Sequence, residues 1–269
     1  MPAARPVAVV VAMEEELLPF RALWPSLRPG DSPGPWETWE GEAGGRPVVV
    51  ALSDCGPVNA AAALEALVSR RGPALVLSAG AAGAHDEEPL PGDVVVGARY
   101  RVLVPPAVQE ERARHGLHPK GFRFRRDGRR EHADLLEAPG ELVERALAAG
   151  EAELPPLGPW RGPGWPADAA PRAGRVVAGT VGSADAWTRG ADELRALRAF
   201  YGTDCEDMES AFLVQLCTLH GLPFVSVRCV SNNELRSPLA PGNVAAAIGL
   251  AAERSARVAA RIAEGAGRP

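Results

Sequence analysis

Short apolar runs alternate with longer amphipathic segments along most of the chain. Residues 7–12 are valine and alanine only, a composition that is typical of a strand buried on both faces. The same pattern recurs between turn-forming residues. We therefore expect strands at 7–12, 37–43, 47–52, 74–84, 92–104, 175–183 and 223–231, and a short strand just before Met208.

Segments with helical spacing of apolar residues separate most of these strands. In 13–24, for example, Leu17, Leu18 and Leu23 are spaced for one helix. We expect helices at 13–24, 59–70, 141–151, 192–200, 209–220 and 243–264. Buried strands separated by helices predict an α/β fold with a mainly parallel sheet covered on both faces.

The middle of the chain breaks this regular order. Residues 104–136 are charged, have no clear period and include His115, His118 and His132, whose spacing matches no zinc pattern. We expect these histidines to be solvated. Residues 155–174 are rich in proline and glycine and predict a surface loop. The region 105–174 is therefore predicted to be a loop-rich excursion from the sheet.

Composition narrows the class of protein. With 269 residues, 46% hydrophobic and 23% charged, the chain has the profile of a globular protein, and its length favours one domain over residues 1–269. A net charge of -5 disfavours nucleic acid and anionic lipid as partners. No apolar run reaches the roughly 20 residues of a membrane helix, and residues 1–11 lack a signal-peptide pattern. We expect a cytoplasmic protein without membrane contact.

The spacing of the cysteines and glycines matches neither a C-x-x-C pair nor a full dinucleotide-binding pattern, so we expect no metal and no cofactor. The cysteines show no C-x-x-C pair and lie mostly in apolar segments, so we expect buried free thiols at Cys55, Cys205, Cys217 and Cys229. The sequence "GAAGA" at 80–84 lacks the full dinucleotide-binding pattern G-x-G-x-x-G.

Polar residues follow several predicted strands directly. In parallel α/β sheets, ligands bind at the carboxyl ends of the strands. The segments at such positions are 14–16, the glycines after Leu77, 207–209 and 231–233. Acidic residues also favour the first turn of any helix, by about 0.3 to 1 kcal/mol. We expect only this helix effect for Glu14 and Glu15, and a solvated position for Glu206.

Five motifs occur in order from Ala12 to Asn232: "AMEEE", "SAGAAGA" with "PLPGDVVVG", "GSADAW", "EDMESA" and "PFVSVRCVSN". Together they resemble the purine nucleoside phosphorylase and nucleosidase superfamily, and most closely the methylthioadenosine/S-adenosylhomocysteine nucleosidases and futalosine hydrolases. The resemblance implies a three-layer αβα sandwich around a central mixed, mainly parallel sheet. It also implies hydrolysis of the N-ribosidic bond of a 5′-substituted purine nucleoside by a homodimer.

The resemblance also assigns roles to individual residues. It implies that Glu16 is the general base that activates water and that Arg228 helps to organise this water. Met208 would lie beneath the sugar, Glu209 would bind the ribose hydroxyls, and Trp187 would stack on the purine. From the glycine-rich turn, Ala81 and Gly83 are candidate substrate-binding residues.

The chemistry of this reaction suits these residue types. Cleavage of an N-ribosidic bond builds positive charge on the sugar, so an anionic group such as Glu209 binds more strongly in the transition state. A positioned carboxylate such as Glu16 that takes a proton from water is worth roughly 10² to 10⁴ in rate. The departing purine also needs a hydrogen-bond or proton donor at its base edge.

Two residues depart from the nucleosidase pattern. The adenine-specific enzymes have Asp where this chain has Asn232, and an amide can donate a hydrogen bond to purine N7 but cannot supply a proton. Asn at this place is similar to what futalosine hydrolases and phosphorylases acting on 6-oxopurines have, which favours a hypoxanthine-type base. Ala81 replaces a serine, so one contact to water or sugar is lost.

Two other functions stay open. A phosphate-dependent phosphorylase of the same fold would need an arginine-lined anion site, but Arg21 lies one helical turn too far along, and Glu16 would repel the anion. A catalytically silent storage or binding relative is the other, since Asn232 and Ala81 both depart from the enzyme pattern. The sequence leaves the 5′ substituent open.

Overall fold

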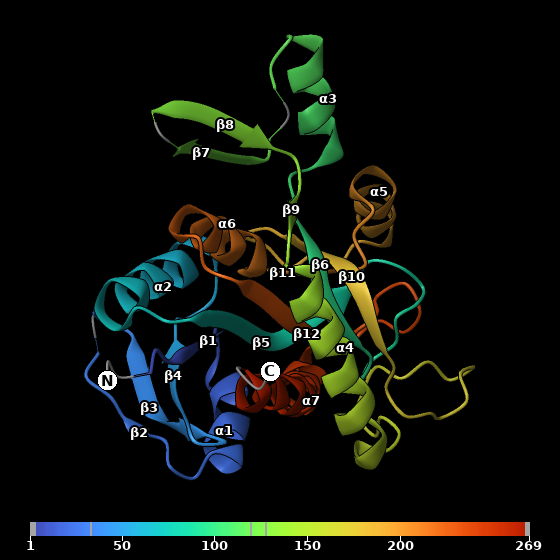
Figure 1. Ribbon diagram of the computed structural model, residues 1–269. Coiled ribbons are helices and arrows are strands. Elements are labelled where there is room, and N and C mark those ends of the chain that lie inside the picture. Colours follow the sequence, from blue (N-terminus) through green and yellow to red (C-terminus); the bar gives the residue numbers. More distant parts are fainter. Residues whose placement is uncertain (1–3, 33, 119, 127, 267–269) are drawn as a thin grey trace.

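The computed structural model describes residues 4–32, 34–118, 120–126 and 128–266, and Figure 1 shows its arrangement. Ten strands form one mixed sheet and two more form a separate hairpin. The strands of the large sheet are β1 (Val7–Val11), β2 (Arg28–Pro29), β3 (Glu37–Ala43), β4 (Arg46–Leu52), β5 (Leu75–Ala84), β6 (Val94–Val102), β9 (Leu136–Glu137), β10 (Val176–Ser183), β11 (Cys205–Asp207) and β12 (Phe224–Asn232).

The sheet runs in the order β11-β10-β6-β12-β5-β1-β4-β3-β2, and β9 pairs with β6. β1 is parallel to β4 and β5, β12 is parallel to β5, and β10 is parallel to β6 and β11. β11 also pairs with β5 in antiparallel orientation, with Glu206 opposite Gly83. This pairing closes β5, β12, β6, β10 and β11 into a ring, so their ends surround one opening.

Helices cover both faces of the sheet (Figure 1). One face carries α2 (Pro57–Arg71) and α6 (Ser210–His220), and the other carries α1 (Glu14–Leu23), α4 (Gly140–Glu153) and α7 (Val244–Gly265). α5 (Ala191–Tyr201) follows β10. This arrangement confirms the predicted three-layer α/β fold with a mixed, mainly parallel sheet.

The side chains of β1 alternate between two hydrophobic cores, one on each face of the sheet. Val7, Val9 and Val11 pack on the face covered by α1 and α7, whereas Ala8 and Val10 pack on the face of α2 and α6. Successive side chains of a strand point to opposite faces, so a strand buried on both faces has to be apolar throughout. In α1, Leu17 and Phe20 are buried but Leu18 is 50% exposed, so only part of the apolar pattern of this helix faces the core.

The middle segment contains more regular structure than the sequence predicted. α3 (Pro106–Arg114), β7 (Phe122–Arg126) and β8 (Arg129–Ala133) extend away from the sheet (Figure 1). His115 and His118 are exposed, as expected. The loop at 155–174 contains a short 3-10 helix at Pro155–Leu157 and an isolated β-bridge between Pro159 and Ala173. It is not only surface, because Trp160 is 5% exposed and packs in the core beside α7.

Among the described residues, no helix is both long enough and apolar enough to cross a membrane. Within the same ranges, no group of three or more His, Cys, Asp or Glu side chains is arranged to hold a metal ion.

Candidate active site

A pocket of about 210 Å³ opens where the carboxyl ends of β1, β5, β10, β11 and β12 meet. It contains all the predicted site residues except Arg228, which lies directly behind it. The lining residues are Ala12, Met13, Glu16, Cys55, Ala81, Ala82, Gly83, Ala186, Trp187, Glu206, Asp207, Met208, Glu209, Ser231, Asn232, Leu239, Val244 and Ile248. Below, the glutamate end denotes Glu16, Ala81, Glu209 and Arg228, and the tryptophan end denotes Gly83, Trp187, Glu206 and Asn232.

Glu16 is fixed by backbone amides. One carboxylate oxygen, Oε2, accepts hydrogen bonds from the N–H groups of Ala12 at 2.8 Å and Met13 at 3.2 Å. The other oxygen accepts from the N–H of Ala81 at 3.0 Å. Glu16 is the third residue of α1, so its side chain reaches back to cap the helix while it faces the pocket. Burial raises its pKa, although the Arg228 charge and these amides oppose the rise.

Gly80 is required for this arrangement. A Cβ atom at Gly80 would lie 2.1 Å from Oε1 of Glu16 and 2.6 Å from Nη1 of Arg228. Both distances are far below van der Waals contact, so a larger residue would displace the Glu16 or Arg228 side chain. The carboxylate and the guanidinium therefore meet over a strand position that has no side chain.

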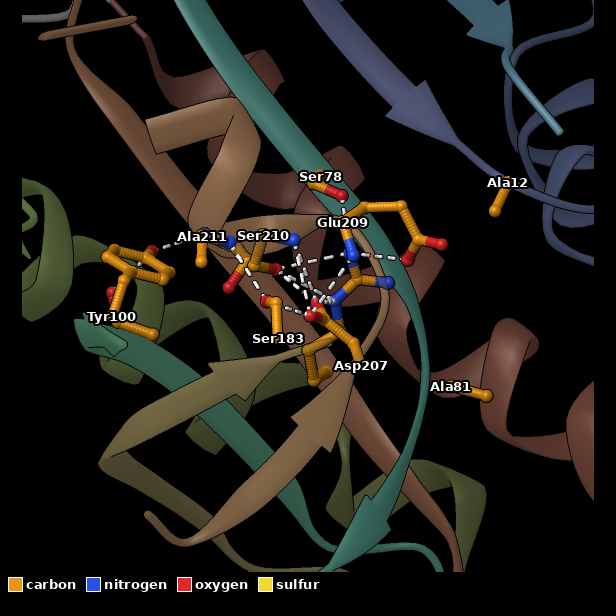
Figure 2. A network of polar contacts seen from close by, with 12 residues as sticks. Ala12, Ser78, Ala81, Tyr100, Ser183, Asp207, Glu209, Ser210 and Ala211 are labelled. Carbon is orange, nitrogen blue, oxygen red and sulfur yellow. Dashed lines mark hydrogen bonds and ion pairs between the residues drawn. The ribbon is translucent and has the colours of Figure 1, made fainter. Parts of the chain in front are cut away.

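Arg228 is buried, and its charge is compensated by acidic and hydroxyl groups. Its Nε lies 2.7 Å from Oδ2 of Asp207, and its Nη2 lies 2.7 Å from Oγ of Ser78 and 3.7 Å from Oε2 of Glu209. Figure 2 shows the side chains of Ser78, Asp207, Glu209 and Ser210 converging from different elements. Burial lowers the pKa of Arg228, but the neighbouring carboxylates more than offset this, so the guanidinium stays charged.

Asp207 links this network to the start of α6. Its carboxylate accepts hydrogen bonds from the backbone N–H groups of Glu209 at 3.3 Å and Ser210 at 3.2 Å, and a short one from the Ser183 hydroxyl. The Ser183 oxygen in turn accepts from the N–H of Ala211 at 2.9 Å. Asp207 therefore serves as both helix cap and counterion, and it joins β10, β11 and α6 to Arg228.

Glu209 faces Glu16 across the same pocket. Its Oε1 accepts a hydrogen bond from the N–H of Gly56 at 3.0 Å. Burial raises the pKa of Glu209 to about 7; Arg228 opposes the rise, whereas Asp207 and Glu16 add to it. A buried carboxyl group with such a pKa, beside a second carboxyl in a cleft, is typical of acid–base chemistry.

The tryptophan end is more open. Trp187 is 40% exposed, and the guanidinium carbon of Arg189 lies 4.9 Å from the centre of its ring. A Cβ on Gly83 would lie 3.6 Å from both the Trp187 indole nitrogen and Nδ2 of Asn232, which is ordinary contact. Met208 also lines the pocket.

Side chains on both sides fix the Asn232 amide. Its Oδ1 accepts from the Ser231 hydroxyl at 2.9 Å, and its Nδ2 donates to Oε1 of Glu234 at 3.3 Å. Glu234 also contacts Arg189 at 3.3 Å, which connects Asn232 to the Trp187 loop. Glu234 is buried and was not singled out from the sequence.

Two sequence expectations about this site were wrong. Glu206 is not a solvated flank: it is 3% exposed, lines the pocket and lies beside buried His85. Cys205, Cys217 and Cys229 are buried free thiols as predicted, but Cys55 is half-buried and lines the pocket. Glu14 and Glu15, in contrast, occupy the exposed first turn of α1 as expected.

The fold and site together define an α/β protein with a carboxylate-rich ligand pocket at the strand ends. A sequence model of the phosphorylase superfamily matches residues 6–264, so the chain belongs to that superfamily. This result confirms the resemblance on which the sequence analysis depended.

Two relatives with similar sequences carry the same enzyme name. The chain is 27% identical over 229 residues to the 5′-methylthioadenosine/S-adenosylhomocysteine nucleosidase of Bacillus thuringiensis (strain Al Hakam), covering 84% of this chain and 85% of that one. It is 28% identical over 194 residues to the nucleosidase of the same name from Treponema pallidum (strain Nichols), covering 69% of this chain and 66% of that protein.

Solved structures share the fold across nearly the whole chain. The Neisseria meningitidis 5′-methylthioadenosine/S-adenosylhomocysteine nucleosidase, in complex with methylthio-immucillin-A, superimposes with a TM-score of 0.74 at 24% identity, covering 97% and 99% of the two chains. The native futalosine hydrolase of Helicobacter pylori strain 26695 gives 0.75 at 18% identity, covering 96% and 97%.

Proposed function

We propose that this protein hydrolyses the N-ribosidic bond of a 5′-substituted purine nucleoside, as methylthioadenosine/S-adenosylhomocysteine nucleosidases do. The observation that carries the proposal is that Glu16 and Glu209, far apart in sequence, line one pocket with Arg228 behind them. The names of the relatives support the same class of reaction.

The glutamate end suits the water and the sugar. Glu16 is the general base: three amides hold its carboxylate in place, and its raised pKa makes it a better proton acceptor near neutral pH. Glu209 accepts hydrogen bonds from the ribose hydroxyls, and its negative charge stabilises the oxocarbenium-like sugar. Arg228 helps to organise the water, and Met208 packs beneath the sugar.

The tryptophan end suits the purine. Trp187 offers a half-exposed ring for stacking, and the absent side chain of Gly83 leaves room beside it. Asn232 donates an amide hydrogen to the departing base, and Ala81 contributes through its backbone N–H to Glu16.

The charge of the pocket favours water over phosphate as the nucleophile. Four carboxylates and no Lys or Arg occur among the described lining residues. Arg21 lies 4.2 Å over the Trp39 ring and is not part of the lining. A phosphate dianion would meet net negative charge here, because the single guanidinium of Arg228 lies behind four carboxylates, and this disfavours the phosphorylase alternative.

A 6-oxopurine nucleoside, as in futalosine hydrolysis, is the second candidate substrate. Asn232 favours it because the amide, held by Ser231 and Glu234, can donate to N7 or O6 but cannot protonate N7. One assay separates these alternatives: purine release from methylthioadenosine, S-adenosylhomocysteine, inosine and futalosine, each with and without phosphate. Strict dependence on phosphate would overturn the hydrolase assignment.

Substitution of Glu16 tests whether the protein is an enzyme or a silent binding relative. Glu16→Gln should lower kcat at least tenfold, or about 1.4 kcal/mol or more. Glu15→Gln is the matched control, because Glu15 lies on the same helical turn but is exposed. Equal rates for the two variants would remove the general-base assignment.

The proposal extends to the whole chain as one nucleosidase-like domain that works as a cytoplasmic homodimer. Within the predicted 105–174 excursion, α3, β7 and β8 project from the sheet, whereas α4 packs on it. Val58, 78% exposed on the first turn of α2, lies two residues from the amide that binds Glu209 and is a candidate contact for a second copy. Light scattering should show a dimer for the wild type and loss of the dimer for Val58→Glu. A monomeric wild type would contradict the proposed homodimer.

A further inference from the structure

A buried acid–imidazole pair adjoins the tryptophan end and has no part in the proposed chemistry. His85, at the end of β5, is 1% exposed, and its Nδ1 lies 2.8 Å from the Thr203 hydroxyl. Its Nε2 lies 3.0 Å from Oε2 of Glu206, although the two atoms are not aligned for a hydrogen bond. Burial of a carboxylate is costly without compensation, so this pair needs a reason to be where it is.

The second oxygen of Glu206 supplies that reason. Oε1 of Glu206 accepts a hydrogen bond from the backbone N–H of Thr188 at 2.5 Å. Thr188 directly follows Trp187 in the irregular segment between β10 and α5. The carboxylate of a β11 residue therefore holds the peptide that carries the exposed indole ring.

A separate set of contacts fixes the arginine that lies over the same ring. Arg189, whose guanidinium lies over Trp187, donates a hydrogen bond to the Leu239 carbonyl at 2.5 Å and contacts Glu234. This contact restrains the side chain of Arg189, whereas Glu206 restrains the backbone. Half-exposed rings on loops are mobile unless the backbone is fixed. The Glu206 contact therefore determines where the Trp187 ring lies.

We propose that Glu206, with His85 and Thr203 behind it, is a positioning residue that sets Trp187 in place for stacking on the purine. Glu206 acts through the Thr188 peptide and takes no proton from the substrate. This role rests on the proposed function only for the identity of the ligand that stacks on Trp187. The position of Trp187 can be measured without a ligand.

Two substitutions of Glu206 separate positioning from charge. Glu206→Gln keeps an oxygen acceptor for the Thr188 N–H, whereas Glu206→Leu fills similar space and leaves that donor unpaired. For Glu206→Leu we expect KM for the preferred nucleoside to rise about tenfold, with kcat within about threefold. Glu206→Gln should keep both constants within about twofold of wild type.

Acrylamide quenching of tryptophan fluorescence in the ligand-free protein gives the second readout. The difference between wild type and Trp187→Phe defines the Trp187 signal among the six tryptophans. Glu206→Leu should change the quenching of that signal and Glu206→Gln should not. A kcat loss without a KM change, or a Glu206→Leu protein with wild-type KM and quenching, would overturn the proposal.

His85→Leu serves if Glu206→Leu does not fold. It removes the support behind the carboxylate and should raise KM about threefold with the same change in quenching; wild-type values for both would refute the role. If the wild type releases no purine from any nucleoside, the proposed function fails, while the quenching result still decides whether Glu206 positions Trp187.

Discussion

The two ends of the pocket are built in different ways. At the glutamate end, three backbone amides from two separate segments hold Glu16, and a fixed guanidinium lies behind both glutamates. At the tryptophan end, single side chains make the contacts: Glu206 of β11 accepts from the backbone N–H of Thr188, and Glu234 accepts from the Asn232 amide. The first end is set by the sheet itself, and the second can change with a single side chain. Chemistry is therefore expected to be fixed at one end and base selection adjustable at the other.

Two glycines of the same strand provide the sharpest test of this difference. Gly80→Ala would place a Cβ 2.1 Å from the Glu16 carboxylate, so the proposed general base has to move. Displacement of a catalytic group by about 1 Å costs roughly a hundredfold in rate, and we expect that loss in kcat. Steady-state purine release measures it, with thermal unfolding to show that the fold persists.

Gly83→Ala is the matched control, three residues further along β5. Its Cβ would make ordinary contacts of 3.6 Å at the tryptophan end, so it should raise KM modestly and leave kcat within about threefold. Equal kcat losses for the two alanine variants would mean that the ends do not differ in rigidity.

The next largest effect is expected from Glu209→Gln, which should lower kcat at least tenfold. In the proposed mechanism only the ionised carboxylate of Glu209 stabilises the sugar cation, and burial raises the pKa of Glu209 to about 7. The kcat/KM of wild type should therefore rise with pH through about 7. The residual activity of Glu209→Gln should not show this rise. A pH-independent wild type between pH 6 and 8 would contradict the assignment.

The same carboxyl group links stability to pH. Because the folded pKa of Glu209 lies above its ordinary value of 4.5, the folded protein retains this proton to higher pH than the unfolded chain. The stabilisation is complete below pH 4.5 and is lost as pH rises through 7, by about 3 kcal/mol. The Tm of wild type should fall relative to Glu209→Gln between pH 5 and 8; parallel curves would contradict this.

The sequence predicted those site residues whose position depends on local pattern. It did not predict those whose position depends on contacts between distant parts of the chain. Glu16, Met208 and Glu209 directly follow buried strands, so local pattern and resemblance located them. Glu206 was assigned to solvent, because its burial depends on β11 pairing with β5 over more than a hundred residues of chain. His85 and Glu234 were missed for the same reason. Glu206 and Thr203, which contact His85, and Arg189, which contacts Glu234, lie in distant parts of the sequence, and no periodicity records such contacts.

Asn232→Asp should shift base preference by about fivefold. Asp at this position would lie beside Glu234, whose Oε1 is 3.3 Å from the present amide nitrogen, and two such carboxyls share a proton at neutral pH. That proton can go to purine N7, so kcat/KM for methylthioadenosine should rise relative to futalosine. The double variant Asn232→Asp with Glu234→Gln lacks the shared proton and should lose the gain. A shift that survives in the double variant would point to shape instead of protonation.

Ala81→Ser should have the smallest effect, although it restores the serine that related nucleosidases have. The contribution of Ala81 is its backbone N–H, which donates to Glu16 at 3.0 Å whatever the side chain is. We therefore expect kcat and KM to change less than about threefold, near what one solvent-replaceable hydrogen bond is worth. A tenfold rise in kcat would show that side chains complete the glutamate end as well, and that the two ends are built alike.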